Sequence, residues 1–78
     1  MVKVKIYTTP TCIYCKMAKQ WFKENNISYE EKDVSSDAQS RQEMIDKSQQ
    51  MGVPVIEVGG ELIIGFDKER LGELLNIK

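Results

Sequence analysis

Thr9-Pro10-Thr11-Cys12-Ile13-Tyr14-Cys15-Lys16 decides how this chain is organised, because here an apolar strand pattern gives way to a helical one. The stretch contains both cysteines of the 78 residues, separated by two positions. N–H groups at the start of a helix stabilise an anion, which favours a thiolate at Cys12. Cys15 follows about one helical turn later, so its sulfur lies on the same face. The pair is therefore able to close a disulfide and reopen it.

Two other interpretations of the cysteine pair are half of a zinc site and two thiols that merely pack. The chain has two cysteines and no histidine, so it does not supply the usual four ligands of zinc. The neighbouring Pro10 and Thr11 mark a turn rather than a core, which argues against inert packing. Redox chemistry is the favoured interpretation, and no metal site is predicted.

The composition is that of one small globular domain covering residues 1–78. Hydrophobic residues make up 41% and charged residues 29% of the chain. No apolar run approaches the roughly 20 residues that a membrane span needs, so we expect no membrane association. Residues 1–5 start directly with a strand pattern instead of a signal peptide. We therefore expect a cytoplasmic protein, in which a catalytic disulfide is more plausible than a structural one.

The net charge of −1 predicts no general attraction to nucleic acid. Positive charge is concentrated in the part of the chain that carries the cysteines, before the first acidic residue, Glu24. The residues concerned are Lys3, Lys5, Lys16, Lys19 and Lys23. They belong either to solvated helix and strand faces or to a region that supports a thiolate or an anionic substrate.

The first half of the chain predicts a strand, a helix and a second strand. Apolar and polar residues alternate over 2–7, with Tyr7 on the more thinly covered face. Residues 13–24 follow a helical period, and residues 27–34 combine apolar positions with a charged run typical of an exposed edge strand. The helical stripe expected in the core consists of Met17, Ala18, Trp21 and Phe22.

The second half predicts a helix over 38–49, a hairpin and a last helix. The hairpin joins residues 53–58 to 61–64 through Gly59-Gly60, a strong signal for a tight antiparallel turn. Asp67 is expected to cap the last helix. The inner face of that helix is formed by Leu71, Leu74, Leu75 and Ile77.

The resulting order, β-α-β-α-β-β-α, indicates an α/β fold with one mixed four-stranded sheet. A parallel β-α-β unit followed by an antiparallel hairpin gives the strand order two-one-three-four. The first and third helices are predicted on one face of the sheet and the second helix on the other.

Three motifs in this order and spacing resemble glutaredoxins, the small glutathione-linked branch of the thioredoxin fold. They are Cys12-Ile13-Tyr14-Cys15 after the first strand, Val53-Pro54 before the third and Gly65-Phe66-Asp67 before the last helix. The likeness covers essentially the whole chain. It implies a thiol–disulfide oxidoreductase with Cys12 as nucleophile and Cys15 as resolving thiol. Glutathione would be a co-substrate rather than a tightly bound cofactor, and protein disulfides would be the partners of an expected monomer.

The resemblance also implies a glutathione-binding groove. The Val53 backbone would bind the peptide part of glutathione like an added strand, beside a cis Pro54. The turn formed by Gly65, Phe66 and Asp67, with the N–H of Lys68, would hold the γ-glutamyl end, and Tyr14 would flank the groove. From the residues alone, Pro54 is a strand-initiating proline and Asp67 an ordinary helix cap.

The chain departs from the family pattern at two places. Ile13 replaces the usual proline between the cysteines, and Thr9-Pro10-Thr11 lacks the lysine that commonly contacts the glycine carboxylate of glutathione. A single Gly65 before Phe66, instead of paired glycines, favours relatives that take electrons from thioredoxin reductase. A third possibility is an iron–sulfur cluster shared by two chains. Such a cluster needs four ligands, and one Cys12 and one glutathione from each chain would supply them.

Overall fold

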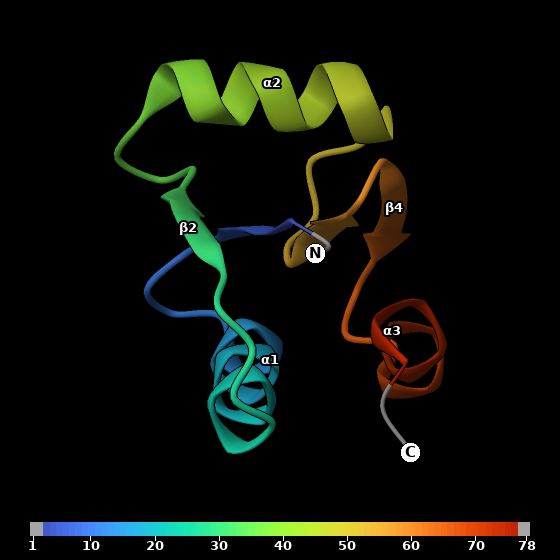
Figure 1. The fold of residues 1–78 in the computed structure, drawn as a ribbon. Helices are drawn as coiled ribbons and strands as arrows, with labels where there is room; N and C mark the ends of the chain where they lie inside the picture. The colour runs from blue at the N-terminus through green and yellow to red at the C-terminus, as the bar shows by residue number, and fades with distance from the viewer. Residues whose placement is uncertain (1–2, 77–78) are drawn as a thin grey trace.

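The computed structural model describes residues 3–76 and has the predicted β-α-β-α-β-β-α order (Figure 1). Val2 and Ile77, which were assigned from the sequence to the first strand and the last helix, lie outside the described residues. The elements are β1 Val4–Thr8, α1 Ile13–Glu24, β2 Glu30–Asp33, α2 Ala38–Ser48, β3 Val55–Val58, β4 Glu61–Ile64 and α3 Lys68–Leu75.

The four strands form one mixed sheet in the order β2-β1-β3-β4, as predicted. β1 pairs with β2 in parallel, and β3 pairs antiparallel with both β1 and β4. Tyr7 lies opposite Val55 in this register, so the end of β1 that leads to Cys12 meets the start of β3. The sheet thus places the turn over residues 9–12, which we call the cysteine turn, beside the segment Val53-Pro54.

Helices cover both faces of the sheet in the predicted arrangement. Figure 1 shows α2 on one side and α1 and α3 together on the other. The larger core lies under α1 and α3, where Ile6, Phe22 and Leu71 are completely buried. The smaller core lies under α2 and joins Met44 to Val55. The cysteine turn belongs to the end of α1 that meets the sheet.

Two side chains differ from the sequence-based expectation. Tyr7, predicted on a thinly covered face, is completely buried against Val34, Met44 and Val55 under α2. Its hydroxyl donates a hydrogen bond to Glu43, and burial followed by this bond raises the pKa of Tyr7 to about 12. Met17, predicted in the core, is 48% exposed because it lies at the edge of the buried stripe of α1.

The strand boundaries also differ slightly from the predicted ones. β2 begins at Glu30 rather than residue 27, and β3 begins at Val55, after the proline. Ile27 and Tyr29 still pack against the core, although they lie before the paired part of β2. Between residues 3 and 76, no helix has both the length and the apolar character needed to cross a membrane.

Candidate active site

Cys12 is the N-cap of α1, and its sulfur takes the role that a serine oxygen has in many helix caps. The residue has an extended backbone, with φ −82° and ψ 115°. Its N–H donates to the carbonyl of Thr9 at 3.4 Å, and its carbonyl accepts from Lys16 at 3.2 Å. The N–H of Cys15 donates to Cys12 Sγ at 3.2 Å. This bond satisfies one of the backbone N–H groups that would otherwise lack a partner at the start of α1.

The two cysteines, both free thiols, differ strongly in access. Cys12 is partly exposed, whereas Cys15 is completely buried. Burial raises the pKa of the Cys15 thiol, and its hydrogen bond with Cys12 raises it further. The hydroxyl of Thr8 and the backbone of Thr9 act in the opposite direction. Only Cys12 is therefore placed to meet an external disulfide first.

The segment Val53-Pro54 lies against the cysteine turn. The peptide bond between these residues is cis, which confirms the geometry implied by the family resemblance. Cys12 Sγ lies 3.8 Å from the carbonyl oxygen of Val53, to which it donates a hydrogen bond. Within residues 3–76 the N–H of Val53 donates to no protein acceptor. A free backbone N–H beside the nucleophilic sulfur is available to an extended substrate.

The turn before α3 is tied to this same segment. Gly65 donates its N–H to the carbonyl of Pro54 at 2.8 Å, and it has a φ of +88°, a conformation that favours glycine. Asp67 caps α3 by accepting the N–H of Arg70 at 3.1 Å. The start of α3 therefore lies close to the Val53-Pro54 segment, as the family motif requires.

The remaining predicted site residues occupy different positions around the turn. Tyr14 is 63% exposed on the first turn of α1. Phe66 packs edge-on against Trp21, with ring centroids 6.2 Å apart. Lys68 is exposed at the first position of α3. Hydrogen bonds thus connect Cys12 Sγ to Val53 and Gly65 to Pro54, whereas the Phe66 side chain packs against Trp21 of α1.

Thr8 is a site residue that the sequence did not identify. It is 1% exposed at the end of β1, and its hydroxyl lowers the pKa of Cys15 while burial raises it. The alternating pattern stops at Tyr7, so Thr8 reads as the first residue of a turn. Extending the predicted strand by one residue to Thr8 would have placed the Thr8 side chain in the interior, near Cys15.

Across residues 3–76, no cluster of three or more His, Cys, Asp or Glu side chains is arranged as a metal site.

The features described so far are a thioredoxin-type sheet, a cysteine pair at a helix start and a cis-proline segment opposite it. Together they define a thioredoxin-fold redox protein. Comparison with known proteins identifies the family within this class.

The chain belongs to the glutaredoxin family, whose model matches residues 4–63. It is 43% identical over 72 residues to an uncharacterized glutaredoxin-like 8.6 kDa protein in the rubredoxin operon of Clostridium pasteurianum, covering 92% of this chain and 96% of that protein. It is 37% identical to glutaredoxin 3 of Escherichia coli K12, covering 86% and 81% of the two chains. The crystal structure of a mutant of the thioredoxin-like protein BC3987 aligns with a TM-score of 0.92 at 37% identity, over 97% of each chain.

Proposed function

We propose that this protein is a thiol–disulfide oxidoreductase that reduces protein disulfides or glutathione mixed disulfides through Cys12 and Cys15. The observation that carries the proposal is the hydrogen bond from Cys15 N–H to Cys12 Sγ, with Cys12 accessible and Cys15 buried. This arrangement gives the two thiols separate roles. Cys12 is the nucleophile, and Cys15 acts after a substrate has been attached.

In the first step the Cys12 thiolate attacks one sulfur of a substrate disulfide. A mixed disulfide forms with Cys12, and the second substrate sulfur leaves as a thiolate that takes a proton from water. Because the chain has no histidine, water or a carboxylate must carry the protons. Thiolate supply and nucleophilicity oppose each other, so a nucleophile with a pKa near ambient pH reacts fastest in such exchanges.

In the second step Cys15 loses its proton and attacks Cys12 Sγ, which releases the reduced substrate and leaves a Cys12–Cys15 disulfide. Two molecules of glutathione then return two electrons and leave as glutathione disulfide. When the substrate is a glutathione mixed disulfide, a second glutathione replaces Cys15 as the resolving thiol. Burial raises the pKa of the Cys15 thiol, so its deprotonation for this attack is harder than that of an exposed thiol.

The backbone of Val53 supports recognition of an extended substrate. Its N–H is free within the described residues, and its carbonyl lies 3.8 Å from the nucleophilic sulfur. A peptide or glutathione aligned here would add a short strand beside Cys12. The start of α3, with the carboxylate of Asp67, would receive the γ-glutamyl end.

A second candidate is a glutaredoxin-like protein that is reduced by thioredoxin reductase. The N–H of Gly65 is already bonded to Pro54, which removes one donor from the turn that would bind glutathione. The turn before Cys12 contains threonines and a proline rather than a lysine. Both features weaken glutathione binding without affecting the dithiol.

A two-donor assay tests the two candidates. NADPH is supplied either with glutathione and its reductase or with thioredoxin reductase, and turnover of a glutathione mixed disulfide and of a protein disulfide is compared. Faster turnover with glutathione supports the first candidate, and faster turnover with thioredoxin reductase supports the second. No turnover of either substrate with either donor contradicts both.

A further inference from the structure

An elongated groove runs between α1 and the start of α3, beginning beside the active site. Its near part, of about 490 Å³, starts at Ile13, the residue after Cys12. A second part, of about 500 Å³, continues toward the end of α3. Both parts are lined by Trp21 and Lys68, so they adjoin. We call the part beside Ile13 the near groove and the other part the distal groove.

The near groove is apolar and open. Ile13 is 70% exposed and Met17, one helical turn later, is 48% exposed. Trp21 continues this row on α1, and Phe66 forms the opposite wall, packed edge-on against Trp21. Apolar side chains gathered in this way on a small surface mark a site of interaction with another molecule. Its floor is rigid, because Trp21 also belongs to the core.

The border of the near groove is mainly positive. Lys16 and Lys68 line it, and within residues 3–76 neither of them forms an ion pair. The carboxylate of Glu24 lies at the far end, where it accepts a hydrogen bond from Gln20 at 3.4 Å. By contrast, Lys19 on the same helix is already paired with Glu31 at 2.8 Å. The two lysines beside the apolar surface therefore remain available to carboxylates of a partner.

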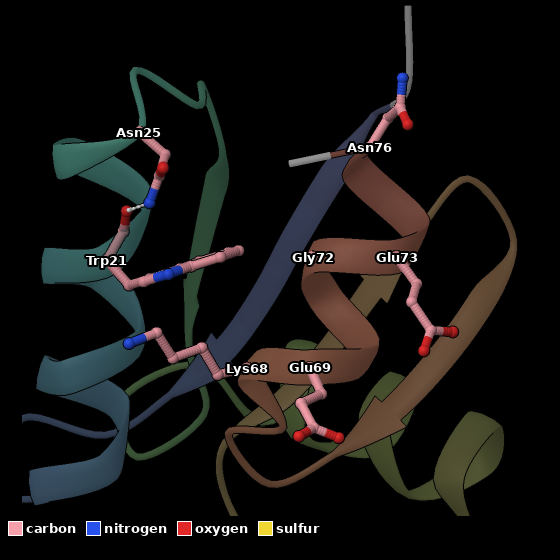
Figure 2. Close-up of a pocket in the computed structure, with 7 residues that line it drawn as sticks. All are labelled: Trp21, Asn25, Lys68, Glu69, Gly72, Glu73 and Asn76. Carbon is pink, nitrogen blue, oxygen red and sulfur yellow. Dashed lines mark hydrogen bonds between the residues drawn. The ribbon is translucent and has the colours of Figure 1, made fainter. Parts of the chain in front are cut away.

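The distal groove has a different character. Figure 2 shows the Trp21 ring extending from α1 toward α3, with the Lys68 side chain reaching back across the gap. Asn25 donates its side-chain amide to the Trp21 carbonyl at 2.9 Å, and Glu69 and Glu73 lie on α3. Two glutamates share this lining with Lys68, so the distal groove is less positive than the near groove and attracts an acidic partner segment less.

We propose that the near groove docks a short segment of the protein disulfide substrate that carries one large aliphatic side chain flanked by carboxylates. The aliphatic side chain packs between Met17 and Phe66, and the carboxylates pair with Lys16 and Lys68. The disulfide sulfur of the same segment then lies beside Cys12. This inference rests on the proposed oxidoreductase activity and adds to it the chemistry of the preferred substrate.

Two synthetic peptides test the proposal directly. Each contains one leucine near one cysteine, which is held in a mixed disulfide with thionitrobenzoate, and the leucine is flanked by two glutamates in one peptide and two lysines in the other. With Cys15→Ser protein, attack by Cys12 on the peptide sulfur forms the mixed disulfide and releases coloured thionitrobenzoate. We expect the acidic peptide to react about three- to tenfold faster than the basic one at low salt, with the difference shrinking as salt is added.

Three variants in the Cys15→Ser background locate this preference. Lys16→Glu should abolish or reverse the ratio of the two rates, and Met17→Asp should slow both peptides while leaving a small thionitrobenzoate disulfide of mercaptoethanol unaffected. Lys23→Glu is the matched control, because Lys23 is exposed on α1 but does not line the groove. The ratio of rates is used because it does not depend on the intrinsic reactivity of Cys12.

Binding without reaction gives a second readout. Trp21 is the one tryptophan of the chain, so its fluorescence reports on the groove when a serine-containing version of the acidic peptide is added. We expect a saturable change that Lys16→Glu weakens. Equal rates for the two peptides, or competition of the fluorescence change by free glutathione, would overturn the docking proposal alone. If neither the peptides nor the small disulfide react, the proposed activity itself is wrong.

Discussion

The N–H of Cys15 donates a hydrogen bond of 3.2 Å to Cys12 Sγ, so the residue assigned to resolve a mixed disulfide already contacts the sulfur that it must attack. The two thiols nevertheless differ in access, because Cys15 is completely buried and Cys12 is not. A substrate can therefore reach one thiol and is excluded from the other. This difference in access follows from position alone, before any difference in chemistry.

Exchange of each cysteine for serine tests these roles. Cys12→Ser should abolish all reduction, because no other thiol is accessible. Cys15→Ser should stop turnover of protein disulfides and trap a mixed disulfide on Cys12, while keeping part of the activity toward glutathione mixed disulfides. The trapped species is measured by mass spectrometry of the intact protein. Full activity of Cys12→Ser would show that the assignment is wrong.

Thr8→Val should slow the resolving step specifically. The Thr8 hydroxyl lowers the pKa of the buried Cys15 thiol, so removing it should raise that pKa further. Without the hydroxyl, a smaller fraction of Cys15 is thiolate at a given pH. The resolving step should therefore become fast only at a higher pH in Thr8→Val than in the unmodified protein. Stopped flow measures its rate after the mixed disulfide has formed.

The first step provides the internal comparison for Thr8. Alkylation of Cys12 should proceed at an unchanged rate in Thr8→Val, because the hydroxyl acts on the other cysteine. Thr11→Val is the matched control, since Thr11 is exposed in the same turn. An identical pH profile for resolution in the unmodified protein and Thr8→Val would show that Thr8 only fills space.

Tyr7 makes the folded state sensitive to alkali. Its pKa is raised from 10.0 to about 12, first by burial and then by the hydrogen bond to Glu43. The stabilisation is complete below pH 10, where both states keep the proton, and it is lost as the pH rises from 10 to 12, because the unfolded chain loses its proton first. Two pH units correspond to at most about 3 kcal/mol of unfolding free energy.

Urea unfolding at pH 9, 10 and 11 measures this effect. The contribution of Tyr7 to the free energy of unfolding should fall by about 1 kcal/mol per pH unit above pH 10. Tyr7→Phe should show a shallower decline than the unmodified protein, and the difference isolates Tyr7 from lysines that titrate in the same range. The ultraviolet absorbance titration of tyrosines should also lose its most alkaline step. Parallel declines for the two proteins would contradict the assignment.

Topology was predictable from the sequence because it depends on patterns that local residues determine. Gly59-Gly60 determined the hairpin, and the change from alternating to helical spacing at Cys12 determined the first β-α unit. Side-chain burial was less predictable where two elements compete for one residue. Tyr7 is covered by α2, and Met17 lies at the edge of a stripe that Trp21 and Phe22 already fill.

In the active site, too, local sequence patterns predicted some features and tertiary contacts decided others. The positions of Cys12 and Cys15 followed from their place at a helix start, and the contact with Val53 followed from the family motif. The role of Thr8 and the near groove did not, because both depend on residues far apart in sequence. Phe66 packs against Trp21 only because α3 lies beside α1, a tertiary contact that no local pattern specifies.

Glutathione recognition at the start of α3 is tested by two substitutions of Asp67 that separate charge from helix capping. Asp67 accepts the N–H of Arg70, so Asp67→Ala removes a cap and should cost about 1 kcal/mol of stability as well as weakening glutathione binding. Asparagine caps a helix as well as aspartate but lacks the charge that would pair with the amino group of glutathione. Asp67→Asn should therefore keep the melting temperature and still raise the KM for glutathione.

Thr9→Lys is the complementary change, because it restores a cation at the turn before Cys12. A charge-assisted hydrogen bond to the glycine carboxylate should lower the KM for glutathione about tenfold, near the low end expected for such bonds because the site is partly exposed. Asp37→Ala, which removes the cap of α2 on the opposite face of the sheet, is the control for loss of a cap alone. If neither Thr9→Lys nor Asp67→Asn changes the KM while thioredoxin reductase supports fast turnover, electrons reach Cys12 without glutathione.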